Sequence, residues 1–267
     1  MQNECGATSN QTAERVLMVM EAMVECNRPE KLVALAQMLN MNQSTLYRFI
    51  SALQNYGYVV QHADGRYAMS MKICYLAERL RQQFNFVEEL HPFVAEASNL
   101  LQESAHLAQM EDMSLVYTDN VANYSQALTI QQFIGKTAPL HCTGIGKLYL
   151  SEMSDDELNH YIEQKGLPRF TKNTYTDKEK LQAELERIRK NGYAFDDEEC
   201  EMGVRCIALP VRDYSGKIAA GISVTGPVAR ITEKLLDSYI VELKNISGRA
   251  SERLGYQERR HAPQTEH

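Results

Sequence analysis

Hydrogen-bonding side chains without any carboxylate gather on one face of the stretch from position 42 to position 58. Leu46, Phe49, Ile50 and Leu53 recur at i, i+3, i+4 and i+7, which predicts an amphipathic helix with Asn42 as its N-cap. The opposite face carries Gln43, Ser44, Thr45, Tyr47, Arg48 and Ser51. Such a face can approach phosphate without repulsion and can hydrogen-bond to base edges, so it suits a helix that enters a DNA groove.

A second short helix is predicted immediately upstream of this stretch. Leu32, Leu35, Ala36 and Leu39 have helical spacing, and only the corner from 40 to 43 separates them from the polar helix. Two short helices joined by a tight turn are the plan of a helix-turn-helix, in which the second helix reads the DNA. A pair of surface helices in a helical bundle is the alternative that this stretch alone leaves open.

A β-hairpin is predicted immediately after the polar helix. The runs 58–62 and 66–70 have strand character, and Asp64-Gly65 between them is a strong hairpin signal. Helix, turn, polar helix and hairpin together describe a winged helix-turn-helix. Arg66 and His62 are then placed in the wing, where they are expected to touch phosphate or the minor groove.

Length and composition predict a globular protein with two domains. The chain has 267 residues, of which 44% are hydrophobic and 24% are charged. No apolar run approaches the roughly 18 residues of a membrane span, and the N-terminus has no signal-peptide pattern, so we expect a cytoplasmic protein without a membrane partner. The six cysteines have neither zinc spacing nor a disulfide pattern. We expect no metal and no cofactor, and most cysteines to be buried.

The net charge of −7 is unevenly distributed along the chain. Residues 1–85 contain 8 Lys and Arg against 7 Asp and Glu, a balance of +1, whereas the remainder contains 20 against 28, a balance of −8. Within 43–81 the count is 5 basic residues to 2 acidic ones, so the expected DNA-binding region is locally positive. This modest charge suggests that affinity comes from two or more modules on one DNA.

The remaining helices are predicted from apolar spacing and capping signals. A first helix is expected over 10–25, one that joins the domains over 73–83, and one from Pro92, capped by His91, to about 103. Two capping boxes, Ser154 with Glu157 and Thr176 with Glu179, predict helices over 155–165 and 177–191, the second ending at Gly192. Further helices are expected over 143–150 and 233–254.

Strands are predicted between these helices. They are expected over 106–110, 115–119, 127–133, 204–212 and 217–225, the last two joined by a hairpin turn over 213–216. The second part of the chain is therefore expected to be an α+β domain built on an antiparallel sheet.

Three stretches of this second domain carry groups that could bind a small molecule. Glycines in the stretch 140–147 open a helix, so its free N–H groups suit an anion, although close helix–sheet packing explains them as well. The acidic stretch 196–201 is typical of a solvated loop, but Asp196 follows an apolar run and is expected to turn inward. Ser223 and Thr225 lie two apart on a strand, so both hydroxyls share a face, as core residues or as a pocket wall.

A thiol enzyme is the alternative reading of this domain. Cys206, or Cys142 beside His141, would be the nucleophile. His141 and Cys142 are adjacent, however, and neighbours on a strand point apart. The polar groups fit the binding of a small anion better than its transformation.

The chain resembles the IclR-type transcription regulators from about position 12 to position 255. In the first domain the matching motifs occupy 34–39, 44–49, Leu53 and 57–59, and in the second they occupy 139–147, 192–193, 196–199, 203–210 and 222–227. Within the family, the stretches 47–49 and 201–206 look most similar to the repressors of 2-keto-3-deoxygluconate catabolism.

This resemblance implies a fold, partners and a binding site. It implies a winged helix-turn-helix domain over 1–70, a linker helix and connection over 71–90, a GAF-like effector domain over 91–256 and a polar tail over 257–267. The family typically forms dimers of dimers that bind small organic acids. Carried over by motif, the effector contacts are the backbone amides of Gly144 and Ile145 and the side chains of Asp196, Cys206, Ser223 and Thr225.

The same resemblance implies the walls of the effector pocket. Family members often carry Ser where this chain has Thr225, so the added methyl group changes the shape available to a ligand. Ala138, Ile130 and Leu128 are expected to form an apolar wall. Arg205 is expected either to reach a second polar group of the ligand or to lie at the surface.

We therefore expect a ligand-responsive regulator of transcription, most simply a repressor of a sugar-acid or other organic-acid operon. Its expected partners are double-stranded operator DNA, contacted by Gln43, Ser44, Thr45, Tyr47, Arg48 and Arg66, a small organic-acid effector, and further copies of itself as a homodimer or dimer of dimers. An enzyme acting on a small acid and a DNA-binding protein without a ligand are the alternatives.

Overall fold

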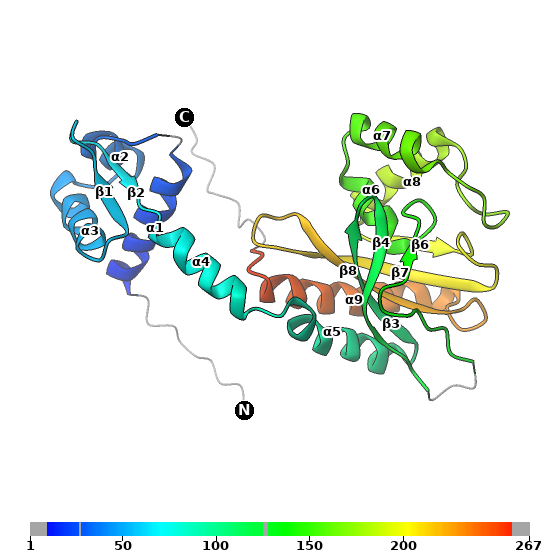
Figure 1. The fold of residues 1–267 in the computed structure, drawn as a ribbon. Helices are drawn as coiled ribbons and strands as arrows, with labels where there is room; N and C mark the ends of the chain where they lie inside the picture. Colours follow the sequence, from blue (N-terminus) through cyan, green and yellow to red (C-terminus); the bar gives the residue numbers. More distant parts are fainter. Residues whose placement is uncertain (1–9, 27, 125–127, 258–267) are drawn as a thin grey trace, which may run out of the picture. The chain divides into compact units, whose positions relative to one another are not determined.

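The computed structural model describes residues 10–26, 28–124 and 128–257 and divides the chain into two compact units between Phe84 and Asn85. The elements of the first unit are α1 (Gln11–Glu25), α2 (Leu32–Met38), α3 (Gln43–Asn55), β1 (Val59–Gln61), β2 (Tyr67–Met69) and α4 (Lys72–Gln83), labelled in Figure 1. The predicted helix, turn, helix and hairpin are thus present in this order. Within the described ranges, no helix has both the length and the apolar composition needed to cross a bilayer.

The apolar stripes of the first three helices meet in one small core. Its buried residues are Val19, Met23, Leu35, Ala36, Leu46, Ile50, Leu53, Val59 and Tyr67. Tyr67 also connects the hairpin to the chain before α2, because its backbone N–H and C=O both bond to Glu30. This core sets the orientation of α3 by burying one stripe, so the opposite stripe faces outward.

The two asparagines at helix starts behave differently. The Asn10 side chain accepts a hydrogen bond from the amide of Ala13 and caps α1. Asn42 occupies the N-cap position of α3 as predicted, but its side chain makes no capping bond. The prediction that the Asn42 side chain caps α3 is therefore wrong, because it accepts no hydrogen bond from the first-turn amides of that helix.

The second unit is a six-stranded sheet with helices on both faces. Its elements are α5 (Phe86–Leu101), β3 (Ser104–Glu111), β4 (Ser114–Val121), β5 (Thr137–Ala138), α6 (Gly144–Glu152), α7 (Asp155–Lys165), α8 (Lys178–Asn191), β6 (Ala194–Asp197), β7 (Val204–Arg212), β8 (Ile218–Pro227) and α9 (Glu233–Arg253). The strand order is β5-β4-β3-β8-β7-β6, and every neighbouring pair is antiparallel. In Figure 1, α5 and α9 lie along one face and α6, α7 and α8 along the other.

Alternation along β7 and β8 separates an apolar face from a polar one. Ile207, Leu209 and Val211 of β7 join the core under α5 and α9, as do Ala220, Ile222 and Val224 of β8. The residues between them, Cys206 and Ala208 on β7 and Ser223 and Thr225 on β8, point to the α6 face. The shared face predicted for Ser223 and Thr225 is confirmed.

Two predicted helix starts are wrong. Asn85 caps α5 through the amide of Glu88, so Pro92 lies inside the helix rather than at its first position. Asp177 caps α8 through the amide of Lys180, while the Thr176 hydroxyl accepts from Arg169 instead. In both places a nearby Asn or Asp competes successfully for the N-cap, which these residue types favour.

The sequence also predicts a strand over 127–133. Residue 127 lies outside the described residues, and residues 128–133 form no strand, so the prediction is wrong there. Phe133 is 71% exposed, and the edge of β4 pairs instead with β5 at Thr137 and Ala138. By contrast, the capping box of Ser154 and Glu157 and the end of α8 at Gly192 are both confirmed.

Gly146 allows α6 to pack closely against the chain segment that precedes it. A Cβ atom there would lie 2.4 Å from both the Cα and the carbonyl oxygen of Leu140. Since these are backbone atoms, no side-chain movement can relieve the overlap. The glycine pattern that opens this helix therefore has a packing role at Gly146.

The buried ammonium group of Lys147 connects α6 to α8 and β6. Its Nζ lies 3.2 Å from Oε1 of Glu184 and 2.7 Å from the carbonyl oxygen of Phe195, and it also pairs with Oε1 of Glu199. Burial alone lowers the pKa of Lys147, but the two carboxylates outweigh this effect and raise it. The side chain is therefore a buried cation held by two anions.

We expect Gly146→Ala to lower the free energy of unfolding by about 1–3 kcal/mol or more, because the added methyl group must displace the backbone of Leu140. Gly248→Ala in α9 is the matched control, since its Cβ would meet nothing within 4 Å. That control should gain about 0.5–1 kcal/mol from helix propensity. Urea denaturation followed by circular dichroism measures both, and equal midpoints for Gly146→Ala and the unmodified protein would contradict the packing role.

We expect Lys147→Met to destabilise the protein by about 3–5 kcal/mol, because it leaves the buried Glu199 carboxylate without its cation and leaves Glu184 with Arg187 alone. Adding Glu199→Gln should recover part of this loss by removing one of the uncompensated charges. Lys190→Met, at an exposed position in the last turn of α8, is the control and should change stability by less than about 1 kcal/mol. A loss no larger than the control's would refute the role assigned to Lys147.

Candidate functional site

The outward stripe of α3 carries the side chains predicted to contact DNA. Gln43, Ser44, Tyr47 and Arg48 are exposed, and Thr45 is half-buried. The first turn of this helix contains no acidic residue. The stripe therefore offers amide, hydroxyl, phenol and guanidinium groups next to free backbone N–H groups, a combination that can bond both phosphate and base edges.

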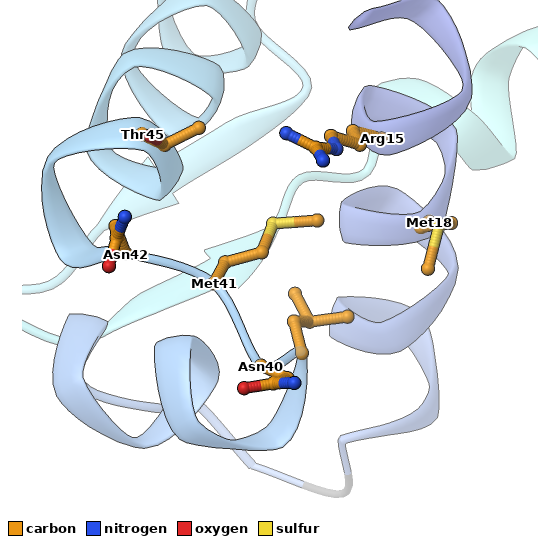
Figure 2. A pocket seen from close by; sticks show the side chains of 7 residues that line it. Arg15, Met18, Asn40, Met41, Asn42 and Thr45 are labelled. Atoms are coloured by element: carbon orange, nitrogen blue, oxygen red, sulfur yellow. The ribbon is translucent and has the colours of Figure 1, made fainter. Parts of the chain in front are cut away.

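A cavity of about 360 Å³ adjoins the start of α3 (Figure 2). Its lining consists of Arg15, Met18, Leu39, Asn40, Met41, Asn42 and Thr45. Figure 2 shows the Arg15 guanidinium reaching from α1 toward Thr45 of α3. Sequence reasoning missed Arg15, because nothing in the apolar spacing of α1 indicates that it lies beside the polar helix.

The wing places its two predicted side chains differently. His62 is exposed at the end of the hairpin. The Arg66 guanidinium pairs with Asp64 at 3.1 Å and donates to the carbonyl of Pro29 at 3.4 Å. Arg66 is thus partly occupied within its own domain, so a DNA contact would have to compete with these bonds.

In the second unit, four strands bring polar side chains into two rows on the α6 face of the sheet. One row runs across the paired positions Asp196, Cys206, Thr225 and Ser104, and the next across Ala194, Ala208, Ser223 and His106. All eight residues are buried. Thr225 lies directly opposite Cys206 in the register of β7 and β8, and Ser223 shares its face. The structure therefore gathers the four predicted side chains Asp196, Cys206, Ser223 and Thr225 in one cluster.

The start of α6 lies over this cluster. A Cβ atom at Gly144 would lie 3.0 Å from that of Ala208 and 3.3 Å from the sulfur of Cys206. The Ile145 side chain packs against Gly221 of β8, so only its backbone can serve a ligand at the polar rows. Thr143, at the N-cap position, makes no side-chain capping bond. The start of α6, with its positive dipole end, thus lies against the buried polar cluster.

Burial controls the protonation of this cluster. Burial raises the pKa of Asp196 well above its usual range, and the nearby Glu199 carboxylate adds to this effect. The backbone amide of Glu199 donates to Asp196 at 2.8 Å, which lowers the pKa but does not outweigh burial. Burial and the charge of Asp196 raise the pKa of Cys206 to about 12, while burial lowers that of His106 to about 4. The cluster favours neutral hydrogen-bonding groups over charged ones.

Three residues of the cluster were missed by sequence reasoning. Ser104 and His106 belong to β3, and Tyr117 on β4 is stacked edge-on against His106 with ring centroids 5.7 Å apart. Burial, followed by the nearby Cys206, raises the pKa of the Tyr117 phenol. Only the register between β3, β4 and β8 could have indicated them, and that register is not readable from one strand at a time.

The residues expected to wall the pocket do not form one buried wall. Leu128 is 60% exposed, while Ile130 and Ala138 are half-buried. Ala138 lines a separate cavity of about 200 Å³ together with Met113, Ser114, Thr137, Pro139, His141, Tyr161, Lys165 and Pro168.

Arg205 points to the opposite face of the sheet from Cys206, where it pairs with Asp197 at 2.6 Å and donates to the carbonyl of Ile231. Of the two alternatives expected for Arg205, these bonds favour a role outside the polar cluster.

The two thiols considered as nucleophiles, those of Cys142 and Cys206, both have a raised pKa. The ring nitrogens of His141 contact the Tyr161 hydroxyl at 3.4 Å and the carbonyl of Pro168 at 3.0 Å. A hydrogen bond to Cys200 and burial raise the pKa of Cys142. Of the five described cysteines, only Cys142 and Cys206 are buried, so the expectation that most would be is wrong.

Comparison with known proteins matches both units. The family described as the bacterial transcriptional regulator IclR C-terminal domain matches residues 79–252, and the IclR helix-turn-helix domain matches residues 12–63. The HTH-type transcriptional regulator KdgR of Escherichia coli is 32% identical over 243 residues, which cover 91% of this chain and 92% of that protein. The transcriptional repressor IclR of the same organism is 30% identical over 229 residues, 84% of this chain and 82% of that protein.

Solved structures agree with these matches. The IclR protein of Thermotoga maritima has a TM-score of 0.61 and 29% identity, covering 92% of this chain and 99% of that one. The C-terminal domain of E. coli KdgR has a TM-score of 0.59 and 32% identity, covering 65% of this chain and 100% of that one. With both units matched in order and across most of its length, the chain belongs to the IclR family of DNA-binding transcriptional regulators.

Proposed function

We propose that this regulator represses an operon for the catabolism of a sugar acid or another organic acid, and that a small 2-oxo or sugar acid controls its binding to operator DNA. The observation that carries the proposal is the convergence of Asp196, Cys206, Ser223 and Thr225 on the start of α6. The names of two relatives, KdgR and the repressor IclR, support a regulator of this kind.

The acid would be held mainly by neutral donors. Its carboxylate lies at the amides of Gly144 and Ile145, where the dipole of α6 favours negative charge. The hydroxyls of Ser223 and Thr225 donate from the sheet, and burial, which raises the pKa of Asp196, favours the protonated carboxyl that can donate as well. Such a site binds an anion without burying a second full charge beside it.

DNA would be read by the outward stripe of α3. Gln43, Ser44, Thr45, Tyr47 and Arg48 contact base edges and phosphates, and Arg66 contacts phosphate when it leaves Asp64. Arg15, which extends toward Thr45, adds a further cation beside the reading helix.

A homodimer or dimer of dimers would supply more than one reading helix. The modest positive charge of the first unit favours such repetition, since each copy adds its own phosphate contacts. Large apolar side chains are exposed on α1, as Leu17, Met18 and Val24, and a second copy would cover them. Sedimentation equilibrium of the full-length protein measures the number of copies, and a monomer at micromolar concentration would reject this part of the proposal.

An enzyme is a poorer fit to the second unit. The raised pKa values of Cys142 and Cys206 keep both thiols protonated, and the His141 ring is engaged by Tyr161 and Pro168. Incubation of the acid with the protein and analysis of the products tests this directly, since turnover would favour an enzyme.

We expect Arg48→Ala to weaken binding to operator DNA by about 1–3 kcal/mol, because an exposed guanidinium on the reading helix can pair with a guanine. The operator is first isolated by selection from random duplexes with the unmodified protein. Arg169→Ala, an equal loss of charge at an exposed position in the second unit, is the control. Gel-shift titration at fixed salt that gives equal affinities for both variants would remove Arg48 from the DNA-binding surface.

We expect the double change Ser223→Ala and Thr225→Val to abolish the response to the acid and to spare DNA binding, since it removes two buried hydroxyls without touching the first unit. A thermal-shift screen of 2-oxo and sugar acids identifies the ligand, because saturation at about 100 times the dissociation constant adds roughly 2.7 kcal/mol of stability. A double variant that is still stabilised like the unmodified protein would show that the acid binds elsewhere.

A further inference from the structure

Two buried polar atoms on β3 have no hydrogen-bond partner in the protein. They are Oγ of Ser104 and Nε2 of His106, whose residues are 2% and 1% exposed. A buried polar group without a partner is costly, because folding strips it of water and returns nothing. The side chains that natural proteins keep in this condition are candidates for contact with a ligand.

Both atoms belong to the polar cluster beneath α6. In the sheet register Ser104 lies opposite Thr225, and His106 lies opposite Ser223, so all four side chains share one face. Nδ1 of His106 lies 3.5 Å from the Thr225 hydroxyl, and the ring packs against Tyr117. The imidazole is thus held in place with its other nitrogen unpaired.

The chemistry of these atoms favours a neutral partner. Ser104 both donates and accepts, and a neutral imidazole nitrogen does one or the other according to its tautomer. Burial keeps His106 neutral at physiological pH, so it offers no positive charge to a second carboxylate. An alcohol hydroxyl, which both donates and accepts, can satisfy either atom without burying another charge.

We propose that Ser104 and His106 form a hydroxyl-binding subsite, so that the effector is an acid that carries hydroxyl groups beyond its carboxylate end. This inference rests on the proposed function, because it places the acid at Gly144, Ile145, Ser223 and Thr225. The subsite extends the site by one strand, from β8 to β3, and makes these two residues the determinants of specificity between sugar-derived and simple oxo acids.

Calorimetric titration of the full-length protein with matched acids tests the subsite. The probes are 2-oxohexanoate against 4,5,6-trihydroxy-2-oxohexanoate, and 2-oxobutanoate against 4-hydroxy-2-oxobutanoate. We expect the unmodified protein to prefer the hydroxylated member of at least one pair by about tenfold. In Ser104→Ala and in His106→Phe, which keeps the aromatic contact with Tyr117, this preference should fall by about fivefold to tenfold, while affinity for the plain acid is retained.

Ser151→Ala is the matched control for loss of a buried hydroxyl. Its hydroxyl already donates to the carbonyl of Leu148 within α6, so the control should leave the preference unchanged. Melting temperatures without ligand add an independent measurement. Ser104→Ala should keep or raise the melting temperature, because it removes an unpartnered group, whereas a purely structural hydroxyl would lower it.

The outcomes separate the two proposals. If no acid binds the unmodified protein, the proposed function fails and the subsite fails with it. If acids bind, and the preference is absent or is the same in Ser104→Ala and His106→Phe as in the unmodified protein, the subsite alone is rejected. A clear drop in the melting temperature of Ser104→Ala would also reject it.

Discussion

The buried cation of Lys147 is the constraint on which the second unit depends. It lies on α6, and its bonds to Glu184 of α8, to the carbonyl of Phe195 in β6 and to Glu199 hold three elements around one charge. The amide of Glu199 in turn donates to Asp196, so the ion cluster also orients the carboxyl group that faces the polar rows. Buried ion pairs of this kind are strongly directional, since any displacement leaves a charge uncompensated.

The two faces of the sheet differ in chemistry. Its α5 and α9 face is filled by apolar side chains, as Ile207 and Ile222 illustrate, whereas the α6 face collects hydroxyls, a thiol and an imidazole. Burial makes these groups neutral and leaves the polar atoms of Ser104 and His106 unpaired. Such a buried polar face costs folding energy, which the apolar packing of the opposite face can offset, and in the proposed function it holds the carboxylate and hydroxyl groups of the acid.

Sequence reasoning succeeded where short-range signals decide the structure. The apolar stripe of α3, the capping box at Ser154 and the end of α8 at Gly192 each depend on residues within one or two helical turns. It failed where two local signals compete, as for Pro92, which lies inside α5 because Asn85 caps the helix earlier. It also failed over 128–133, where strand-like composition meets no partner strand.

The sequence by itself determined the type of most elements, the order of the two domains and, through the family resemblance, a first set of site residues. Only the tertiary structure decided which side chains meet. Ser104 and His106 reach Thr225 and Ser223, more than a hundred positions away, because β3 pairs with β8 in one register, and a shift by one residue would turn every side chain to the other face. Alternation along β7 likewise turns Arg205 to the face opposite that of Cys206. Such pairings depend on the packing of the whole sheet, which local propensity does not encode.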